Sequence, residues 1–135
     1  MSVTVDNQPD VEAAHAFLSA HAYWCKNIPL QTLSRACAGS ICFSAKAGGR
    51  QIGFARVVTD GATFAYLADV YVLEEHRGRG VSKLLLEAID AHSRLQGLRR
   101  WMLATRDAHG LYRKHGWRDS TPGRLMERVL EKPYG

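Results

Sequence analysis

One short turn has the residue types best suited to chemistry: Arg77-Gly78-Arg79-Gly80-Val81-Ser82. It follows an apolar run that ends at Leu73 and precedes a helical pattern that begins at Val81. A helix N-terminus exposes unpaired backbone N–H groups and the positive end of the helix dipole. Glycines just before it let the backbone approach a phosphate closely, and the two arginines add positive charge. The turn therefore predicts a binding site for a phosphate or pyrophosphate.

Two common phosphate-binding motifs do not fit this turn. The Walker pattern is absent, because no second glycine followed by Lys-Ser or Lys-Thr stands at the required distance. The dinucleotide pattern G-x-G-x-x-G fails at its third glycine, where the sequence has Lys83. A glycine-rich turn that only redirects the chain, with its arginines as solvated charge, is the alternative explanation.

The residues around the turn predict a mixed sheet flanked by helices. Apolar residues at helical spacing, with Asp10 as the N-cap, predict a first helix over 11–22, and Gly39 closes a second over 30–37. Alternating patterns and turn signals predict three strands, at 41–45, 51–59 and 63–73. After the turn we expect a helix (81–96), a buried strand (101–104), a short helix (108–115) and a last strand (125–130). The expected fold class is α/β (α+β), mostly antiparallel, in one domain over residues 1–135.

Composition and cysteine spacing exclude several classes of protein. Hydrophobic residues make up 46% and charged residues 23% of the 135 residues, which is typical of a folded globular chain. No apolar run approaches the roughly 20 residues of a membrane span, and the polar N-terminus does not resemble a signal peptide. We therefore expect a cytoplasmic protein with no membrane partner. Cys25, Cys37 and Cys42 form neither a C-x-x-C pair nor a zinc-like cluster, so we expect reduced thiols and no metal.

The basic charge of the chain is concentrated in its second half. The sequence has 18 Lys and Arg against 13 Asp and Glu, a formal net charge of +5. Such an excess suits a polyanionic cofactor, and it also suits nucleic acid. The sequence has no helix-turn-helix or RNP-like pattern, so we do not expect a nucleic-acid partner.

Two segments resemble motifs of the GNAT N-acetyltransferase family. Segment 67–85, with Arg77-Gly78-Arg79-Gly80 after the strand, is similar to the family motif R/Q-x-x-G-x-G/A. Segment 103–117 resembles the block A-x-x-L-Y-x-K-x-G-F, with Trp117 in place of the usual Phe. The last position of the first motif is usually Gly or Ala and is Ser82 here, a small residue whose hydroxyl offers a phosphate a donor. The resemblance implies a GNAT fold whose splayed central strands hold acetyl-CoA.

The resemblance also implies which residues bind the coenzyme. The backbone of the strand would pair with the amides of the pantetheine arm in the manner of an added strand, while the turn would hold the pyrophosphate. The expected coenzyme-binding residues are Val70, Tyr71, Val72, Arg77, Gly78, Arg79, Gly80, Val81, Ser82, Ala108 and Tyr112.

Tyr112 and Asp69 are the expected catalytic residues. Tyr112 matches the family's tyrosine that hydrogen-bonds the departing sulfur, and a phenol near a thiol of pKa about 8.5 can stabilise the thiolate. Tyr112 also fits the apolar stripe of its helix, which leaves a packing role open. Asp69 is the carboxylate nearest to the thioester and a candidate base. Strict alternation places it on the opposite face from Val70 and Val72, and a bulge would change that count.

Three aromatic residues are the candidates for the acceptor site. Tyr23 and Trp24 lie between the first two helices, a loop that lines the acceptor pocket in the family, and aromatic rings suit a hydrophobic or cationic acceptor. Trp24 also suits packing of the helix pair onto the sheet, so this alternative stays open. Tyr66 is a candidate for binding substrate and for positioning a water molecule.

The sequence thus predicts an N-acetyltransferase that uses acetyl-CoA. We expect direct transfer to a primary amine of a small molecule or peptide in a ternary complex, without a metal or a covalent enzyme intermediate. A homodimer is a further expectation, since dimers are common in the family. The alternatives are a GNAT-fold regulator that binds coenzyme A without catalysis, and a small basic nucleic-acid-binding domain.

Overall fold

The computed structural model describes residues 2–135, and the chain divides into two compact units, Met1–Ala104 and Thr105–Gly135. The first unit holds a five-stranded sheet with helices, and the second holds one short helix. The mixed sheet flanked by helices that the sequence predicts is confirmed. The expectation of one domain over residues 1–135 stays a prediction.

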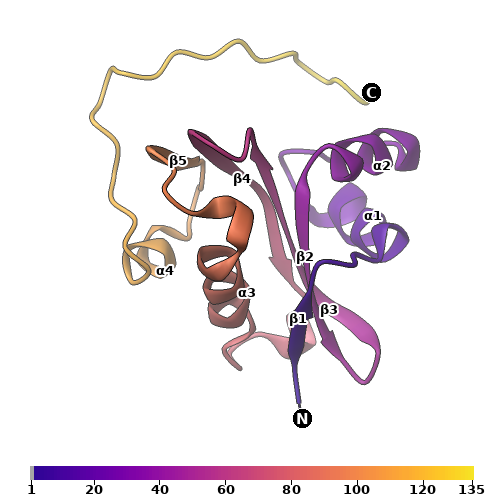
Figure 1. Ribbon diagram of the computed structural model, residues 1–135. Helices are drawn as coiled ribbons and strands as arrows, with labels where there is room; N and C mark the ends of the chain where they lie inside the picture. The colour runs from indigo at the N-terminus through magenta and orange to yellow at the C-terminus, as the bar shows by residue number, and fades with distance from the viewer. Residues whose placement is uncertain (1) are drawn as a thin grey trace. The chain divides into compact units, whose positions relative to one another are not determined.

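The strands lie side by side in the order in which they follow along the chain (Figure 1). The first four pair antiparallel, and the fifth pairs parallel to the fourth. The strands are β1 (Thr4–Asp6), β2 (Ile41–Ala47), β3 (Arg50–Thr59), β4 (Phe64–Val72) and β5 (Arg100–Leu103). The helices of this unit are α1 (Val11–His21), α2 (Leu30–Ala38) and α3 (Val81–Ala91), with short 3-10 helices η1 (Glu74–His76) and η2 (Ser93–Leu95).

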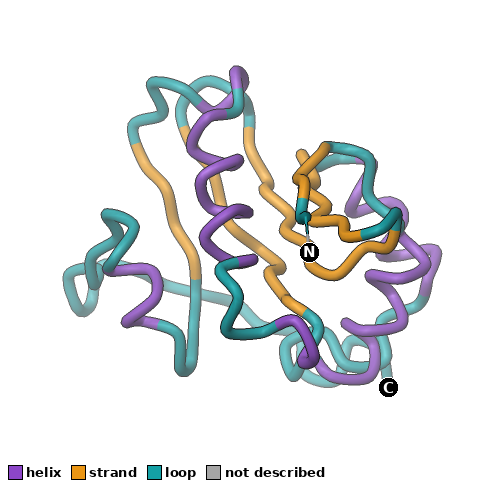
Figure 2. The backbone as a smooth tube through the Cα atoms, turned by 90° about the horizontal axis from the view of Figure 1, so that it is seen from below, coloured by secondary structure: helices purple, strands orange, loops and turns teal. Residues whose placement is uncertain are grey.

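Helices cover both faces of the sheet, with α1 and α2 on one face and α3 on the other (Figures 1 and 2). Phe17 of α1 stacks on Tyr71 of β4, with ring centroids 4.1 Å apart. On the other face, a Cβ added to Gly53 would meet side-chain atoms of Val81 and Leu85 at 3.2 and 3.3 Å. Since successive residues of a strand point to opposite faces, these contacts define an α1–α2 face and an α3 face for β3 and β4.

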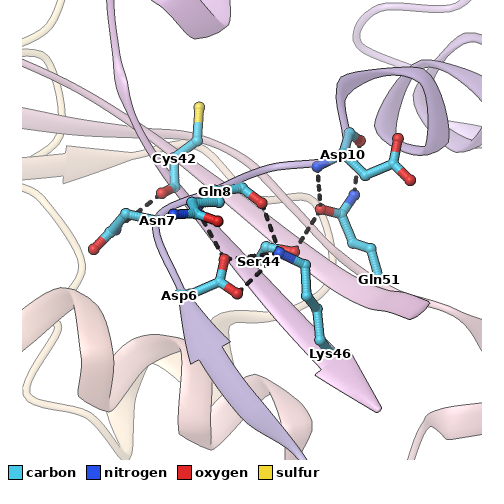
Figure 3. Close-up of polar contacts among 8 residues, drawn as sticks. All are labelled: Asp6, Asn7, Gln8, Asp10, Cys42, Ser44, Lys46 and Gln51. Carbon is cyan, nitrogen blue, oxygen red and sulfur yellow. Dashed lines mark hydrogen bonds and ion pairs between the residues drawn. The ribbon is translucent and has the colours of Figure 1, made fainter. Parts of the chain in front are cut away.

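A buried polar network ties the start of α1 to the sheet (Figure 3). The side-chain oxygen of Gln51 accepts from the Ser44 hydroxyl at 2.6 Å and from the Asp10 backbone N–H at 2.9 Å. The side-chain nitrogen of Gln51 donates to the Asp10 carbonyl at 3.1 Å and to the Tyr71 hydroxyl at 3.2 Å. Asp10 also caps α1 by accepting from the N–H of Ala13, so the predicted N-cap is confirmed.

β4 contains a bulge at Ala68, and its pairing with β5 ends beside that bulge. Arg56 of β3 pairs with Asp69. Val57, the next residue of β3, pairs with Leu67, so Ala68 is an extra residue in β4. The parallel pairing with β5 also ends at Leu67. Within residues 2–135, β4 therefore has neighbours on both sides up to Leu67 and one open edge beyond it.

One predicted helix is too long, and one strand was missed. The helix expected over 81–96 ends at Ala91, because the backbone of His92 is extended. Nδ1 of His92 accepts from the N–H of Arg94 and so caps η2. Strand β1 was not predicted, since three partly polar residues carry little strand signal. It pairs with β2 and is reinforced by an ion pair between Lys46 and Asp6 at 2.9 Å.

The predicted strand at 125–130 is wrong. This segment forms no regular element, and its apolar side chains are exposed, Met126 by 98%. The apolar residues occur as the adjacent pairs Leu125-Met126 and Val129-Leu130, so neither face of a strand would be continuously apolar. The strand predicted at 101–104 exists as β5, but its residues Trp101 to Leu103 are partly exposed rather than buried.

Gly53 is predicted to be required for the packing of α3 on the sheet. Gly53→Val should lower the free energy of unfolding by about 1–3 kcal/mol, because branched methyl groups would be forced against Val81 and Leu85. Urea unfolding followed by circular dichroism measures the change. Gly110→Val is the control, since no atom lies within 4 Å of its added Cβ, and it should change stability by no more than about 0.5 kcal/mol. Equal effects of the two substitutions would contradict the packing argument.

Candidate functional site

The turn 77–82 leads directly into the N-terminus of α3. Gly78 and Gly80 have φ angles of +77° and +78°, a conformation that favours glycine, and no atom lies within 4 Å of a Cβ added to either one. Gly80 is the N-cap of α3 and provides no side-chain acceptor for the first N–H groups of the helix. The turn therefore presents unpaired backbone donors, the positive end of the dipole and empty space above both glycines, which together suit an anion.

The two arginines of the turn have different surroundings. Arg77 folds back, and its Nε donates to the carbonyl oxygen of Val72 at 3.0 Å. Arg77 thus links the turn to the end of β4, and its positive charge lies beside the strand. The side chain of Arg79 is exposed, so its positive charge is accessible to an anion from solvent.

The open edge of β4 exposes some backbone groups and not others. The N–H of Leu73 donates to the carbonyl of Ile52 at 2.8 Å, which makes these two residues a hydrogen-bonded antiparallel pair. Alternation then directs the backbone groups of Tyr71 toward β3 and those of Val70 and Val72 toward the open edge. The expectation that all three residues pair with a pantetheine arm stays a prediction, and the sheet pairing of the Tyr71 backbone favours Val70 and Val72 for this role. The Tyr71 hydroxyl lies on the α1–α2 face, and burial raises its pKa to about 12.

Asp69 is buried, with 4% of its surface exposed, and both of its carboxylate oxygens are occupied. Nε1 of Trp24 donates to one oxygen at 2.7 Å, and Nε of Arg56 donates to the other at 2.7 Å. A general base needs an oxygen within hydrogen-bond reach of the substrate or of a water molecule. This geometry argues against Asp69 as the base. The alternation expected from the sequence holds, with Asp69 on the α1–α2 face and Val70 and Val72 on the α3 face.

The bulge places the candidate acceptor residues on one face of the sheet. Tyr66 pairs with Val58, and Asp69 pairs with Arg56, so all four point to the α1–α2 face although Tyr66 and Asp69 are three residues apart. Trp24 also lies on the α1–α2 face, because its Nε1 donates to Asp69. Tyr23 lies edge-on to Trp24, with ring centroids 5.1 Å apart. The first unit therefore brings Tyr23, Trp24 and Tyr66 to the neighbourhood of the bulge.

The second unit holds the other two candidate residues on or next to helix α4 (His109–Arg113). Ala108 is the N-cap of α4, and its N–H donates to the Thr105 hydroxyl oxygen at 3.0 Å. The Tyr112 carbonyl accepts the N–H of Trp117 at 3.1 Å, and the two rings lie edge to face. Burial raises the pKa of the Tyr112 phenol, which keeps it protonated at neutral pH and suited to donate a proton.

Sequence reasoning missed Arg56, Val58 and His76. Arg56 and Val58 depend on the β3–β4 register, which no local pattern reveals. Nδ1 of His76 is buried just before the turn and has no hydrogen-bond partner within residues 2–135. The three cysteines are free, buried thiols.

Over the described range 2–135, no group of three or more His, Cys, Asp or Glu side chains is arranged to hold a metal ion. None of the helices in that same range has the length and apolar character needed to cross a membrane.

Residues 38–119 match the family model described as the acetyltransferase (GNAT) domain. The match covers more than half of the chain and contains both the glycine turn and Tyr112. It therefore includes the open edge of β4, the turn and the short helix of the second unit.

Known proteins with similar sequence or structure agree with this match. A curated relative from Gibberella zeae, named a putative acetyltransferase, is 36% identical and covers 78% of this chain and 71% of its own. The crystal structure of a putative GNAT-family acetyltransferase from Xanthomonas campestris is 49% identical, has a TM-score of 0.94 and covers 99% of this chain and 97% of its own. AAC(6')-Iy, solved with a bisubstrate analogue of coenzyme A, shares the fold with a TM-score of 0.66 at 19% identity, covering 96% and 98%. The chain belongs to the GNAT acetyltransferase family.

Proposed function

We propose that this protein transfers the acetyl group of acetyl-CoA to a primary amine. One observation carries the proposal: the open edge of β4 runs from the bulge at Ala68 to the end of the strand, next to the glycine turn at the start of α3. Such an edge suits an extended amide-containing chain, and such a turn suits a pyrophosphate. Pantetheine joined to a pyrophosphate has this sequence of groups.

The coenzyme is proposed to bind in two parts. The backbone groups of Val70 and Val72 pair with the pantetheine amides, apart from the Val72 carbonyl, which already accepts from Arg77. The N–H groups of Gly78 to Ser82 hold the pyrophosphate, with Arg79 adding charge and the Ser82 hydroxyl adding a donor. The family resemblance implies two further coenzyme contacts. Ala108, at the start of α4, would contact the coenzyme, and Tyr112 would hydrogen-bond its sulfur.

The reaction is proposed to proceed by direct attack in a ternary complex. The neutral amine forms a C–N bond to the thioester carbonyl carbon, and backbone N–H groups of β4 stabilise the negative oxygen of the tetrahedral intermediate. Collapse of the intermediate breaks the C–S bond and releases the coenzyme as a thiolate. The phenol of Tyr112 donates its proton to this thiolate, and the proton lost by the amine returns to the phenolate through water. No metal and no covalent enzyme intermediate take part.

The acceptor must lose a proton before it attacks, and Asp69 is poorly placed to take it. Water positioned by Tyr66, which is partly exposed beside the bulge, is the proposed route for this proton. We propose that the acceptor, a small molecule or a peptide, approaches along the α1–α2 face, where Tyr23 and Trp24 also lie. A homodimer is proposed as the assembly because dimers are common in the family, and the cytoplasm is proposed as the compartment.

Two other functions predict different results for thiol release, coenzyme A binding and DNA binding. A GNAT-fold regulator would bind coenzyme A without releasing thiol from acetyl-CoA when amines are added. A basic nucleic-acid-binding domain would bind DNA in a salt-dependent way and would not bind coenzyme A. Thiol release in the presence of a panel of small amines, amino acids and peptides tests the proposed transfer, and amine-dependent release supports it.

The glycine turn is predicted to determine coenzyme A affinity. Gly80→Ala should weaken binding about tenfold, because an alanine at this positive φ strains the turn and its methyl group occupies the space proposed for the pyrophosphate. Titration calorimetry with coenzyme A measures the change. Gly49→Ala is the matched control, with φ of +79° against +78° and equally empty surroundings, but in the β2–β3 hairpin. If both variants lose affinity equally, the turn is not the binding site.

Tyr112→Phe is predicted to lower kcat roughly 10²-fold while changing coenzyme A affinity little, because it removes the proton donor and keeps the ring. Steady-state kinetics and coenzyme titration separate the two effects. Since burial raises the Tyr112 pKa, the alkaline decline that belongs to this group should begin above the range in which an exposed tyrosine titrates. Tyr134→Phe serves as the control and should retain wild-type turnover. An unchanged kcat in Tyr112→Phe removes this residue from the mechanism.

A further inference from the structure

A patch of apolar side chains lies exposed beside the bulge on the α1–α2 face. Tyr23 is 53% exposed, Trp24 44% and Val58 38%, and Tyr66 is partly exposed. Val58 and Tyr66 are cross-strand partners, and Trp24 reaches the same face through Asp69. We call these four residues, Tyr23, Trp24, Val58 and Tyr66, the aromatic wall.

The exposure of Trp24 distinguishes the two explanations for this residue. A tryptophan that only packed helices onto a sheet would be buried on both ring faces, whereas Trp24 keeps nearly half of its surface in solvent. Its polar edge is fixed by the bond from Nε1 to Asp69. A ring that is fixed at one edge and open on its surface is suited to contact a ligand.

The position of Trp24 depends on a buried ion pair. Arg56 donates through Nε to Asp69 at 2.7 Å and through Nη1 to the Ser40 hydroxyl at 3.1 Å. The Asp69 side chain is 5% exposed and the Arg56 side chain 17%. Burying two charges costs free energy that their attraction often only partly offsets, so stability alone does not account for this pair. The geometry that the pair specifies is the orientation of the Trp24 ring.

The ion pair also determines the electrostatic character of the wall. The buried Asp69 carboxylate is paired with one guanidinium, and none of the four wall residues is charged, so the wall presents aromatic and aliphatic surface. An acceptor would gain free energy there chiefly by burying an apolar group. The wall lies beside Leu67, where β4 and β5 part and where the thioester is proposed to lie.

We propose that the aromatic wall binds the apolar body of the acceptor and that the Arg56–Asp69 pair positions Trp24 for this contact. The acceptor class is a primary amine attached to an aromatic or branched aliphatic group. This inference rests on the proposed acetyl transfer. Arg56 and Asp69 are positioning residues, and neither touches the reacting atoms.

Selectivity between two amines of matched reactivity tests the wall. The wild type should acetylate 2-phenylethylamine with a kcat/KM about tenfold above that for ethanolamine, whose basicity is similar, as expected for one apolar group in a partly open site. Trp24→Ala should remove this preference and leave the KM for acetyl-CoA unchanged. Arg50→Gln is the charge-loss control, since the Arg50–Glu75 pair is exposed and lies outside the wall, and this variant should retain the preference. An equal kcat/KM for both amines in the wild type overturns the proposal.

The positioning role has a readout that needs no acceptor. Asp69→Asn should raise amide hydrogen exchange in the loop 22–28 and lower the preference for 2-phenylethylamine, with exchange in α3 unchanged. Arg56→Lys should keep more of the preference than Arg56→Gln, because a lysine retains the charge but not the second hydrogen bond. Unchanged loop exchange and unchanged preference in Asp69→Asn would overturn the positioning role.

The result that overturns acceptor binding by the wall can be distinguished from the result that overturns acetyl transfer. If no amine releases thiol from acetyl-CoA, the proposed function fails, and quenching of tryptophan emission by 2-phenylethylamine then tests the wall alone. Quenching in the wild type that is lost in Trp24→Phe supports the wall as an amine-binding surface. The absence of quenching in the wild type overturns it.

Discussion

The extra residue at Ala68 determines how the rest of the candidate site is arranged. It interrupts the β3–β4 ladder beside the point where β5 stops pairing with β4, so the second half of β4 has a free edge. An unpaired edge buried in a sheet protein is costly unless something pairs with it, which makes it a natural place for an extended ligand. The same extra residue turns Tyr66 and Asp69 to one face. A single irregularity therefore provides both the proposed coenzyme-binding edge and the proposed acceptor side.

The two ends of this edge are stabilised by different interactions. At the bulge, a buried carboxylate holds Trp24 and is itself held by Arg56. At the far end, Arg77 binds the Val72 carbonyl and fixes the glycine turn to the strand. The turn itself contributes backbone donors and a helix dipole, which act on an anion without a specific side chain. The side chains thus hold the backbone in place, and the backbone makes most of the proposed coenzyme contacts.

The sequence predicted the features that local pattern determines. The Asp10 cap, the glycine turn and the alternation of the central strands each depend on neighbours a few residues away, and the structure contains all three. It did not predict the bulge at Ala68 or the partners of Asp69, because both depend on β3, which is distant in the chain. The choice of Asp69 as base stays a prediction that its geometry argues against, because the sequence shows its proximity to the site but not the hydrogen bonds to both of its oxygens. The predicted strand at 125–130 is wrong for a related reason: its apolar residues are visible in the sequence, but a strand also needs a partner strand, which the sequence does not show.

The central claim is that the open edge of β4 binds coenzyme A through alternate residues. Amide hydrogen exchange of the full-length protein, measured by NMR with and without coenzyme A, tests it most directly. The account predicts that coenzyme A slows exchange at the N–H groups of Val70 and Val72 and in the turn 78–82, and leaves Tyr71 unchanged because its N–H already pairs with β3. Coenzyme A binding that leaves exchange at Val70 and Val72 unchanged, or protects residues elsewhere instead, would contradict the account.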